Sequence, residues 1–489
     1  MNNDGGLDLL AVESFTWHLE IACEICLREA AAGRRVGFAF LDVINVDEFP
    51  LDTLFAAQVY AARHSIRLAK VRAIEQILRS RGVTVITAGS APPGARLSCA
   101  GTGTESIAAL RDLRVGGAAI GLGVVSSLIR YSADIDPDFG ANRALIDRML
   151  TSAYQVFHLT RQLIDHYRPT AILVFNGRLA CTKAVSEAAR IAGVESFYYE
   201  VGGAYDRYYF SSRPPQSSEN ARELLRRAWA GAGVDRVSVA EQYFARGRGG
   251  APLRETAFVA EQLPGRSVAP TGRRRIVYYV SSIDEYVAVE EGVEHVLFDS
   301  QRAAVRWLIG WVGSRPDTEL VIRVHPRMRR LSLKERDWWA SLAAANVIVL
   351  PAESPVDSYA LADSADRVLC YHSSMCVEAT YLEKVAILLG DASYRGLDCV
   401  YEPDSLGALV QLLEDNAVPP KPREHCLPFG YYRMRRGEEF KFFRPTECGG
   451  GDFFGVPVAS GKMSLTGRVR NKVLWILLPV LQRFGRPTA

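Results

Sequence analysis

Two series of alternating helix and strand patterns, one in each half of the chain, constrain its fold more than any other feature. In the first half, short apolar runs of strand length alternate with longer segments whose apolar residues recur at helical spacing. The expected strands are Arg35–Asp42, Val83–Ile86, Ala171–Phe175 and Ser196–Glu200, and the expected helices are Val12–Ala32, Leu54–Ser80, Arg143–Tyr167 and Arg178–Ala192. Such alternation predicts right-handed βαβ units and a parallel sheet.

The second half repeats this alternation with cleaner boundaries. Its expected strands are Arg275–Ser282, Glu319–Val324, Val347–Leu350, Arg367–Tyr371 and Val385–Leu389, and its expected helices are Gln301–Val312, Val356–Ala362 and Met375–Leu382. Short strands that alternate with helices in this way are typical of a Rossmann-like unit. We therefore expect a second parallel sheet in this half.

The length of the chain and a change in composition divide it into domains. With 489 residues it is longer than one ordinary domain. Residues 246–272 are rich in Gly, Arg, Pro and Ser, as linkers are. We therefore predict an α/β fold with a first Rossmann-like domain at 1–245, the linker at 246–272, and a second such domain at 273–425. A tail follows at 426–489, and its irregular part before Gly461 is a candidate to cross back to the first domain.

Charge and cysteine usage exclude several classes of protein. A formal net charge of +3 is almost balanced and gives no support for general nucleic-acid binding. The nine cysteines are scattered, and the N-terminus lacks the pattern of a signal peptide, so we expect a cytoplasmic protein. Cys23 and Cys26 form one CxxC without a second pair at zinc spacing, which favours buried helix thiols over a metal or redox site.

The end of the chain is the one segment that suggests a membrane. No apolar run reaches the roughly 18 residues that a transmembrane helix needs. Val473–Leu481 is apolar between basic flanks, which is typical of an amphipathic helix on an anionic membrane surface. A helix packed on the body of the protein explains the pattern equally well. Peripheral attachment to the inner membrane therefore stays open.

A candidate phosphate site follows the strand Glu319–Val324. Ligands of parallel α/β sheets bind beyond the carboxyl ends of the strands. Arg323 and His325 alternate along this strand end and share a side, and Pro326 ends the strand. An Arg and a His so placed suit a phosphate or diphosphate, although a locally bonded His at a strand end is the commoner role.

Other polar residues follow neighbouring strands of the same series. Ser373 and Ser374 stand between a strand and a helix, where they offer hydroxyls to an anion or simply cap the helix. Glu378 lies one turn further along that helix and suits ribose hydroxyls, or else faces solvent. After the first strand of the series come Ser281, Ser282 and Glu285. Their order along one sheet edge suits a nucleotide-linked sugar.

These motifs resemble bacterial capsule and O-antigen glycosyltransferases of GT-B fold. The resemblance rests on VIRVHP (321–326), SYALADSADRVLCYHSSMCVEATYLEKVAILLG (358–390) and SYRGL (393–397), with VSSIDEY (280–286) and FDSQ (298–301). In the first half it rests on SFTWHLEIACE (14–24), FNGR (175–178) and YEVGGAYDRY (199–208). The HP and SS motifs are similar to those of Kdo transferases, polysialyltransferases and teichoic-acid glycerophosphotransferases.

The resemblance implies two Rossmann-like domains that face a cleft. It implies that 1–245 binds a lipid-linked or glycan acceptor and that 273–425 binds the nucleotide sugar, with His325, Ser373 and Ser374 at the donor phosphate. A CMP-linked donor is favoured, and no further cofactor is expected. The chain departs from the family's usual Gly-Lys-Pro at Glu383-Lys384-Val385, and from its usual Gly at Cys376. The nucleotide base therefore stays open.

Transfer between such domains needs a base or nucleophile, and the first half offers three candidates. Glu200 ends a predicted strand before Gly202 and Gly203, which permit close approach of a ligand. It is the leading catalytic carboxylate, as base or nucleophile. His18 is the second candidate and Asp206 lies near Glu200 in sequence.

Three further residues of the first half are candidates for acceptor binding. Asn176 and Arg178 follow the strand Ala171–Phe175 and suit sugar or phosphate contacts. Glu20 belongs to the same segment as His18, where a salt-bridged helix face is the alternative. No DxD-type metal motif stands near a strand end, so we expect no metal site, with phosphate charge met by Arg323, His325, the serines and a helix N-terminus.

Three other functions remain compatible with the sequence. A polyol-phosphate transferase with a CDP-activated donor would use the same motifs but move a phosphoryl group. A non-hydrolysing sugar-nucleotide epimerase would share the two Rossmann-like domains but need no acceptor. A polysaccharide-assembly scaffold would bind nucleotide without turnover.

Overall fold

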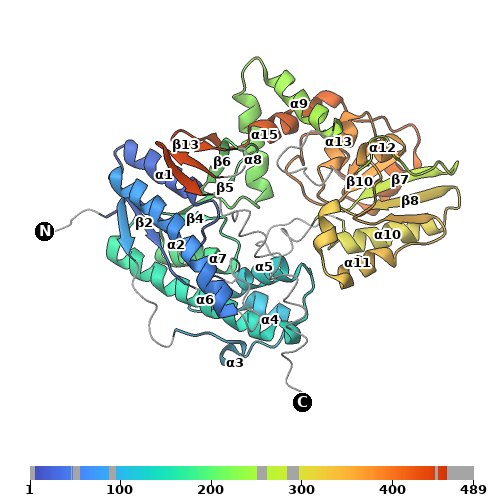
Figure 1. Cartoon of the computed structure of the whole chain (residues 1–489). Coiled ribbons are helices and arrows are strands. Elements are labelled where there is room, and N and C mark those ends of the chain that lie inside the picture. The colour runs from blue at the N-terminus through green and yellow to red at the C-terminus, as the bar shows by residue number, and fades with distance from the viewer. Residues whose placement is uncertain are drawn as a thin grey trace. The chain divides into compact units, whose positions relative to one another are not determined.

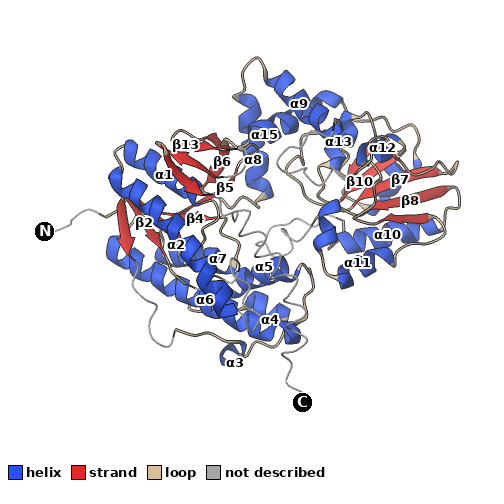
Figure 2. Ribbon diagram, viewed as in Figure 1, coloured by secondary structure: helices blue, strands red, loops and turns tan. Residues whose placement is uncertain are grey.

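The computed structural model describes residues 6–43, 45, 47, 56–87, 95–249, 262–282, 297–446 and 450–459. The chain forms two compact units. Unit 1 contains residues 1–131, 137–215 and 437–489, and unit 2 contains residues 132–136 and 216–436. Each unit is a sheet covered by helices, as the secondary-structure colouring shows (Figure 1, Figure 2).

Unit 1 is built on a mixed sheet whose five first strands are parallel. The strands are β1 (Leu9–Glu13), β2 (Val36–Phe40), β3 (Thr84–Thr87), β4 (Ala171–Phe175), β5 (Glu195–Val201), β6 (Arg207–Ser211) and β12 (Glu438–Glu439). Their order is β12-β6-β5-β4-β1-β2-β3, with β6 antiparallel to β5 and β12 antiparallel to β6. The parallel strands follow the 3-2-1-4-5 order of a Rossmann-like sheet, so the switch point lies between β1 and β4.

Helices bury the central strands of this sheet on both faces. They are α1 (Leu19–Ala31), α2 (Ala56–Ser80), α3 (Cys99–Thr102), α4 (Ile107–Asp112), α5 (Ile120–Ser132), α6 (Phe139–Tyr167) and α7 (Ala180–Ala192). All residues of β1, β2 and β4 are buried, which explains their continuous apolar runs. Cys23 and Cys26 lie buried in α1, as predicted for helix thiols.

Two strands of unit 1 differ from the sequence-based prediction. The helix predicted from Val12 begins only at Leu19, and the run Leu9–Glu13 before it is the central strand β1. A short apolar run that is buried on both faces cannot be told from a helix segment by periodicity. The strand β6 was not predicted, because the chain turns back on β5 within a few residues.

Unit 2 contains a fully parallel five-stranded sheet. Its strands are β7 (Arg274–Tyr279), β8 (Thr318–Arg323), β9 (Val347–Leu350), β10 (Arg367–Cys370) and β11 (Ala386–Leu388), in the order β11-β10-β7-β8-β9. Its helices are α8 (Ser218–Ala230), α9 (Arg236–Arg248), α10 (Gln301–Gly313), α11 (Leu333–Ala340), α12 (Ser358–Asp363), α13 (Met375–Tyr381), α14 (Leu406–Glu414) and α15 (Leu427–Arg435). This is again the 3-2-1-4-5 order, with its switch point between β7 and β10. The prediction of two Rossmann-like α/β units is confirmed.

The boundary between the units differs from the predicted one. The chain enters unit 2 at Gln216, before the segment 246–272 that its composition marked as a linker. The reason is tertiary packing, because α8 and α9 lie against α15 and contribute Leu225, Tyr243 and Phe244 to the core of unit 2. Residues 250–261 of the predicted linker lie outside the described residues.

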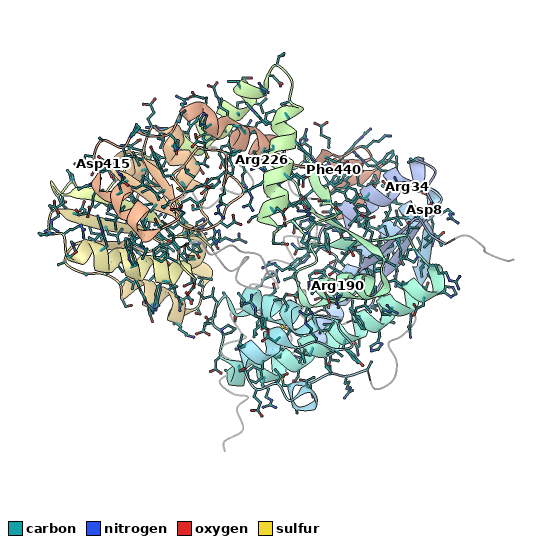
Figure 3. The ribbon with its side chains drawn as sticks, turned by 180° about the vertical axis from the view of Figure 1, so that it is seen from behind. Asp8, Arg34, Arg190, Arg226, Asp415 and Phe440 are labelled. Carbon is teal, nitrogen blue, oxygen red and sulfur yellow. The ribbon has the colours of Figure 1, made fainter. Side chains whose placement is uncertain are left out.

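The last described segment returns to unit 1, as the sequence suggested for the irregular tail. After β12 it forms a small antiparallel sheet of β13 (Phe443–Pro445), β14 (Gly450–Phe453) and β15 (Val456–Ala459). Figure 3 labels Phe440 of this segment in the same unit as Arg34 and Asp8, which come from the start of the chain. The predicted amphipathic helix Val473–Leu481 lies outside the described residues. Among the helices that are described, none combines the length and apolarity needed to cross a bilayer.

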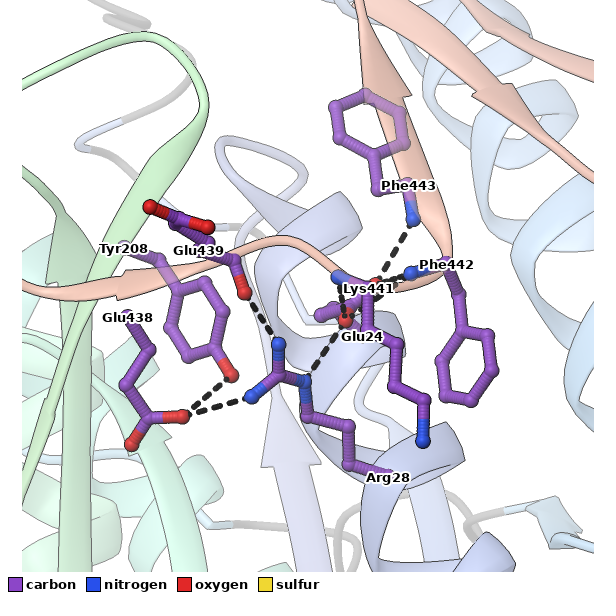
Figure 4. Close-up of polar contacts among 8 residues, drawn as sticks. All are labelled: Glu24, Arg28, Tyr208, Glu438, Glu439, Lys441, Phe442 and Phe443. Carbon is purple, nitrogen blue, oxygen red and sulfur yellow. Dashed lines mark hydrogen bonds and ion pairs between the residues drawn. The ribbon is translucent and has the colours of Figure 1, made fainter.

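A fully buried carboxylate attaches this returning segment to α1. Glu24 accepts hydrogen bonds from the backbone N–H groups of Lys441, Phe442 and Phe443, at 2.6–3.2 Å (Figure 4). It also accepts one from Arg28 Nε at 2.9 Å. The Arg28 guanidinium continues to the Glu438 carboxylate at 2.8 Å and to the Glu439 carbonyl. One helix turn of α1 therefore holds five residues of the tail between Glu438 and Phe443.

Candidate active site at two sheet edges

The switch point of unit 2 brings two predicted segments together. Ser281 follows β7 and His372 follows β10, and the His372 backbone N–H donates to Ser281 Oγ at 2.8 Å. Gln301, at the start of α10, accepts from the Ser281 backbone N–H at 2.7 Å and donates to the Ser281 carbonyl at 3.2 Å. Ser281 is buried, so it joins the two strand ends. Sequence reasoning missed Gln301, which only the fold places beside Ser281.

The paired serines lie at the same edge and are only partly buried. Ser373 Oγ accepts from the Met375 backbone N–H at 3.3 Å, and the Ser373 carbonyl accepts from the Tyr394 hydroxyl at 2.6 Å. Ser374 stands at the N-terminus of α13 without capping it through its side chain. The Ser374 side chain hydrogen-bonds the Tyr243 hydroxyl. Both partly buried serines therefore lie at the strand ends where ligands of such sheets bind.

Arg323 does not present its guanidinium to this crevice. It is 2% exposed, and its terminal nitrogens donate to the carbonyls of Pro351 at 2.8 Å and Ser354 at 3.1 Å. Burial also lowers the pKa of the guanidinium. The predicted phosphate contact therefore needs correction: Arg323 holds the loop after β9, because an Arg that follows a buried strand finds carbonyl oxygens before it reaches solvent.

His325 keeps its predicted place at the edge. It is partly buried and precedes the 3₁₀ turn Pro326–Arg330. Its Nδ1 accepts from the Arg327 backbone N–H at 3.1 Å. This bond places the proton of a neutral His325 ring on Nε2, which is then a hydrogen-bond donor.

Glu378, predicted to bind ribose, lies in the interior of unit 2. It is 6% exposed, and it accepts from the hydroxyls of Tyr243 at 3.2 Å and of Tyr359. Burial, and next the Glu378 charge, raise the pKa of both tyrosines. The carboxylate thus links α9, α12 and α13, and the geometry favours this role over contact with a ribose.

The edge of unit 1 unites two other predicted residues. Asn176 follows β4 in the left-handed region at φ 59°, and its Nδ2 donates to Glu200 Oε2 at 2.7 Å. Glu200 Oε1 accepts from the Val201 backbone N–H at 3.0 Å. Glu200 remains partly exposed. Its carboxylate is therefore fixed in orientation beside the switch point between β1 and β4.

His18 and Glu20 form a second group at this edge. His18 precedes α1 with φ 59°, and its Nδ1 lies 3.6 Å from Glu20 Oε1. Lys70 of α2 donates to Glu20 Oε2 at 2.8 Å. Burial would raise the pKa of Glu20, but Lys70 and His18 outweigh it and hold this pKa well below its usual value. Lys70 was not predicted, because nothing in its helical pattern links it to the loop before α1.

Glu13 is a further carboxyl group that the sequence analysis missed. It ends β1 at the switch point and is 1% exposed. Neither carboxyl oxygen of Glu13 has a hydrogen bond of standard geometry. Burial raises the pKa of Glu13 well above its usual value, and the nearby Tyr199 hydroxyl offsets only part of this shift. The signal was a carboxylate at the end of an apolar run, and it was hidden because β1 was taken for helix.

The remaining predicted site residues do not take part in the contacts described at either sheet edge. Gly202, Gly203 and Asp206 lie in the turn from β5 to β6, where a Cβ at Gly202 would stand 2.6 Å from the Arg207 carbonyl carbon. The turn itself, and not a ligand, therefore requires glycine at 202. Arg178 and Ser282 are partly buried near their strand ends. Glu285 lies outside the described residues.

Comparison with known proteins gives structural likeness only. No protein-family model matches the chain, and no curated protein matches it in sequence. A β-Kdo 2,4-transferase, KpsC of Thermosulfurimonas dismutans, is 14% identical, with a TM-score of 0.33 over 53% of this chain and 78% of that one. The glycosyltransferase SnogD of Streptomyces nogalater is 14% identical. Its TM-score is 0.24, over 87% of this chain and 94% of SnogD. The UDP-GlcNAc 2-epimerase of Neisseria meningitidis, bound to UDP-GlcNAc, is 12% identical. Its TM-score is 0.26, over 88% of this chain and 94% of the epimerase.

Proposed function

We propose that this protein is a glycosyltransferase that moves a sugar from a nucleotide-activated donor to a growing surface polysaccharide, a capsule or a lipopolysaccharide O-antigen. The observation that carries the proposal is the switch-point edge of unit 2. There the partly buried Ser373, Ser374 and His325 bring two hydroxyl groups and an imidazole to the carboxyl ends of the strands. Neutral groups of this kind suit the phosphate of a nucleotide sugar. They belong to the HP and SS motifs, which resemble those of transferases that use CMP-activated sugars.

The edge of unit 1 supplies the carboxylate that the reaction needs. Glu200 is oriented by Asn176 and by its neighbouring backbone N–H, so it can face a reacting sugar as base or nucleophile. The acceptor in this proposal is a lipid-linked or glycan chain. Attachment to the cytoplasmic face of the inner membrane belongs to the same proposal.

A thermal-shift screen tests the donor site. The full-length protein is heated with CMP, CDP, UDP, GDP or ADP, and the same screen is run on His325→Ala. A nucleotide that binds the folded state raises the midpoint by mass action. We expect one cytidine or uridine nucleotide to stabilise the protein and His325→Ala to lose that shift. His425→Ala, a partly exposed histidine of the same unit, is the matched control and should keep it.

Product analysis then separates the transferase from its rivals. We expect a glycosidic product without added phosphorus and without change of the donor when acceptor is absent. Phosphorus in the product would identify a polyol-phosphate transferase, and isomerised donor an epimerase. No shift with any nucleotide would contradict the donor site itself.

A further inference from the structure

The loop between β1 and α1 is held at its start by buried groups. Arg67 of α2 is 3% exposed and donates to the Ser14 carbonyl at 2.7 Å and to the Val43 carbonyl at 3.3 Å. Asn45 Nδ2 donates to the same Ser14 carbonyl at 3.2 Å. The ends of β1 and β2 are therefore linked through one helix.

The end of the same loop is held by a second cation of α2, one helix turn further on. Lys70 is 8% exposed, and its ammonium contacts Glu20 at the start of α1. A buried ammonium needs a partner of opposite charge, so this pair fixes the position of the Glu20 carboxylate. Arg67 and Lys70 thus hold the loop Ser14–His18 from one side.

His18 is strained, oriented and open on one nitrogen. A left-handed backbone at a residue other than glycine costs about 1–3 kcal/mol and occurs most often at functional sites. The ring lies 5.7 Å from that of Phe175 at the end of β4, and only Nδ1 faces the Glu20 carboxylate. The side chain is 28% exposed. Among the described residues no group bonds to Nε2.

We propose that His18 is the general base of this edge, with Glu20 and Lys70 as its positioning residues. The inference rests on the proposed glycosyltransferase function. Nε2 takes the proton of an acceptor hydroxyl as its oxygen bonds to the anomeric carbon. The bond from that carbon to the donor phosphate breaks, and its electron pair leaves with the nucleotide. The imidazolium then returns its proton to water.

The difference between His18 and Glu200 supports this assignment. Both oxygens of Glu200 already accept hydrogen bonds from the protein, whereas His18 Nε2 keeps a lone pair directed away from its carboxylate. The pattern of a basic nitrogen, an orienting carboxylate and a third group that fixes the carboxylate follows the general logic of catalytic triads. Glu200 is then left to contact the sugar.

His18→Asn is the first variant, because asparagine tolerates the left-handed backbone that alanine would strain. We expect the turnover number to fall about 10²–10⁴-fold, since general base catalysis contributes that much. The nucleotide thermal shift should stay, and added imidazole should restore part of the rate. His166→Asn, an exposed histidine of α6, is the control and should be unaffected.

Glu20→Gln tests the positioning role by a spectroscopic signature. An amide can donate to Nδ1 and so leave the proton on Nε2, where no lone pair remains for catalysis. We expect nitrogen NMR of the His18 ring to show Nδ1–H in the wild type and a shift towards Nε2–H in Glu20→Gln. Turnover should fall at least about tenfold with little change in KM. Lys70→Met should lower turnover in the same direction.

Each outcome has one meaning. Normal turnover of His18→Asn, or an Nε2–H ring in the wild type, would overturn the inference and leave the proposed function intact. A wild-type protein that binds nucleotide but forms no glycosidic bond would overturn the proposed function, and the inference with it.

Discussion

At the residue scale, the sheet edge of unit 1 places carboxyl groups in contrasting surroundings. Glu13 is buried between the sheet and α1 with its pKa raised by burial. Glu20 is also largely buried, but Lys70 and His18 reverse the shift of its pKa. Burial therefore favours the neutral form of Glu13, whereas Lys70 and His18 favour the charged form of Glu20.

The protonation of Glu13 predicts a dependence of stability on pH. The pKa of Glu13 in the folded state lies above its unfolded value of about 4.3. Below that unfolded pKa, Glu13 is protonated in both the folded and the unfolded chain, so it costs no stability. As the pH rises the unfolded chain ionises first, and the native state loses stability until the folded pKa is reached. Glu13→Gln cannot ionise. We therefore expect the free energy of unfolding of Glu13→Gln, relative to the wild type, to increase by about 1.4 kcal/mol for each unit of rising pH.

Urea denaturation of both proteins between about pH 5 and about pH 7 measures this difference. A constant gap over that range would show that Glu13 is ionised in the native state.

Glu200→Gln tests the carboxylate that the sequence analysis made the leading catalytic candidate. The amide keeps the shape of the side chain but removes its charge, so the charged contact of Glu200 with the sugar is lost. We expect the turnover number to fall about 10²-fold or more, with the unfolding midpoint unchanged. Near-normal turnover in a folded variant would remove Glu200 from the mechanism.

At the scale of elements, buried carboxylates join segments that lie far apart in the chain. Glu24 holds the returning tail on α1, and Glu378 links α9 and α12 to α13. The donors are neutral N–H or O–H groups fixed by their elements, with the charged Arg28 guanidinium as a further donor to Glu24. A carboxylate replaces several separate contacts, because its two oxygens accept several hydrogen bonds at once.

Glu24→Gln is expected to loosen the tail. One amide nitrogen would face backbone N–H donors, so we expect a loss of about 2–4 kcal/mol in the free energy of unfolding and faster proteolysis within residues 437–459. Glu29→Gln is the matched control, because this α1 carboxylate pairs with the exposed Arg34 at 2.6 Å. It should cost less than about 1 kcal/mol. Equal losses in both variants would mean that the tail contributes nothing through Glu24.

Two glycines in helices should respond to alanine with opposite signs. A Cβ at Gly247 in α9 would clash with the Tyr359 hydroxyl beside Glu378, so Gly247→Ala should destabilise by about 1–3 kcal/mol. Gly310 in α10 has open space around its Cβ position, and Gly310→Ala should stabilise by about 0.5–1 kcal/mol. Thermal unfolding of the two variants checks the pair. Stabilisation by Gly247→Ala would contradict the close contact between α9 and α12.

At the scale of the whole molecule, one strand order is used twice. Both sheets follow 3-2-1-4-5, and in each the polar residues gather where the first and fourth strands diverge. The two edges differ in chemistry: unit 2 offers hydroxyls and a histidine donor, and unit 1 offers carboxylates with a histidine. In the proposed function, unit 2 binds the donor and unit 1 activates the acceptor.

The same division predicts activity without a divalent metal. In the proposal, hydroxyls and His325 meet the phosphate charge instead. We expect EDTA to leave the transfer rate unchanged. Loss of activity in EDTA that magnesium restores would contradict this.

Much of the fold could be predicted from the sequence, but less of the site. The strands β4 and β9 were predicted with their observed bounds, since apolar runs bounded by polar residues mark a buried strand. Asn176 and Glu200 were both expected at strand ends, and the fold brings them into contact. Arg323 and Glu378 were expected at the ligand, yet they bond within unit 2, because a strand-end or helix position does not reveal which partners lie nearby.

By itself, then, the sequence determined the α/β class, the two Rossmann-like units and the edges at which polar residues follow strands. Hydrophobic periodicity is a local property, so it can be recognised from the sequence alone. Only the tertiary structure decided that β1 is a strand, that α8 and α9 belong to unit 2, and that Lys70 reaches Glu20 while Glu13 stays buried. These depend on contacts between residues distant in sequence, because burial and charge pairing are set by what the fold packs against each side chain.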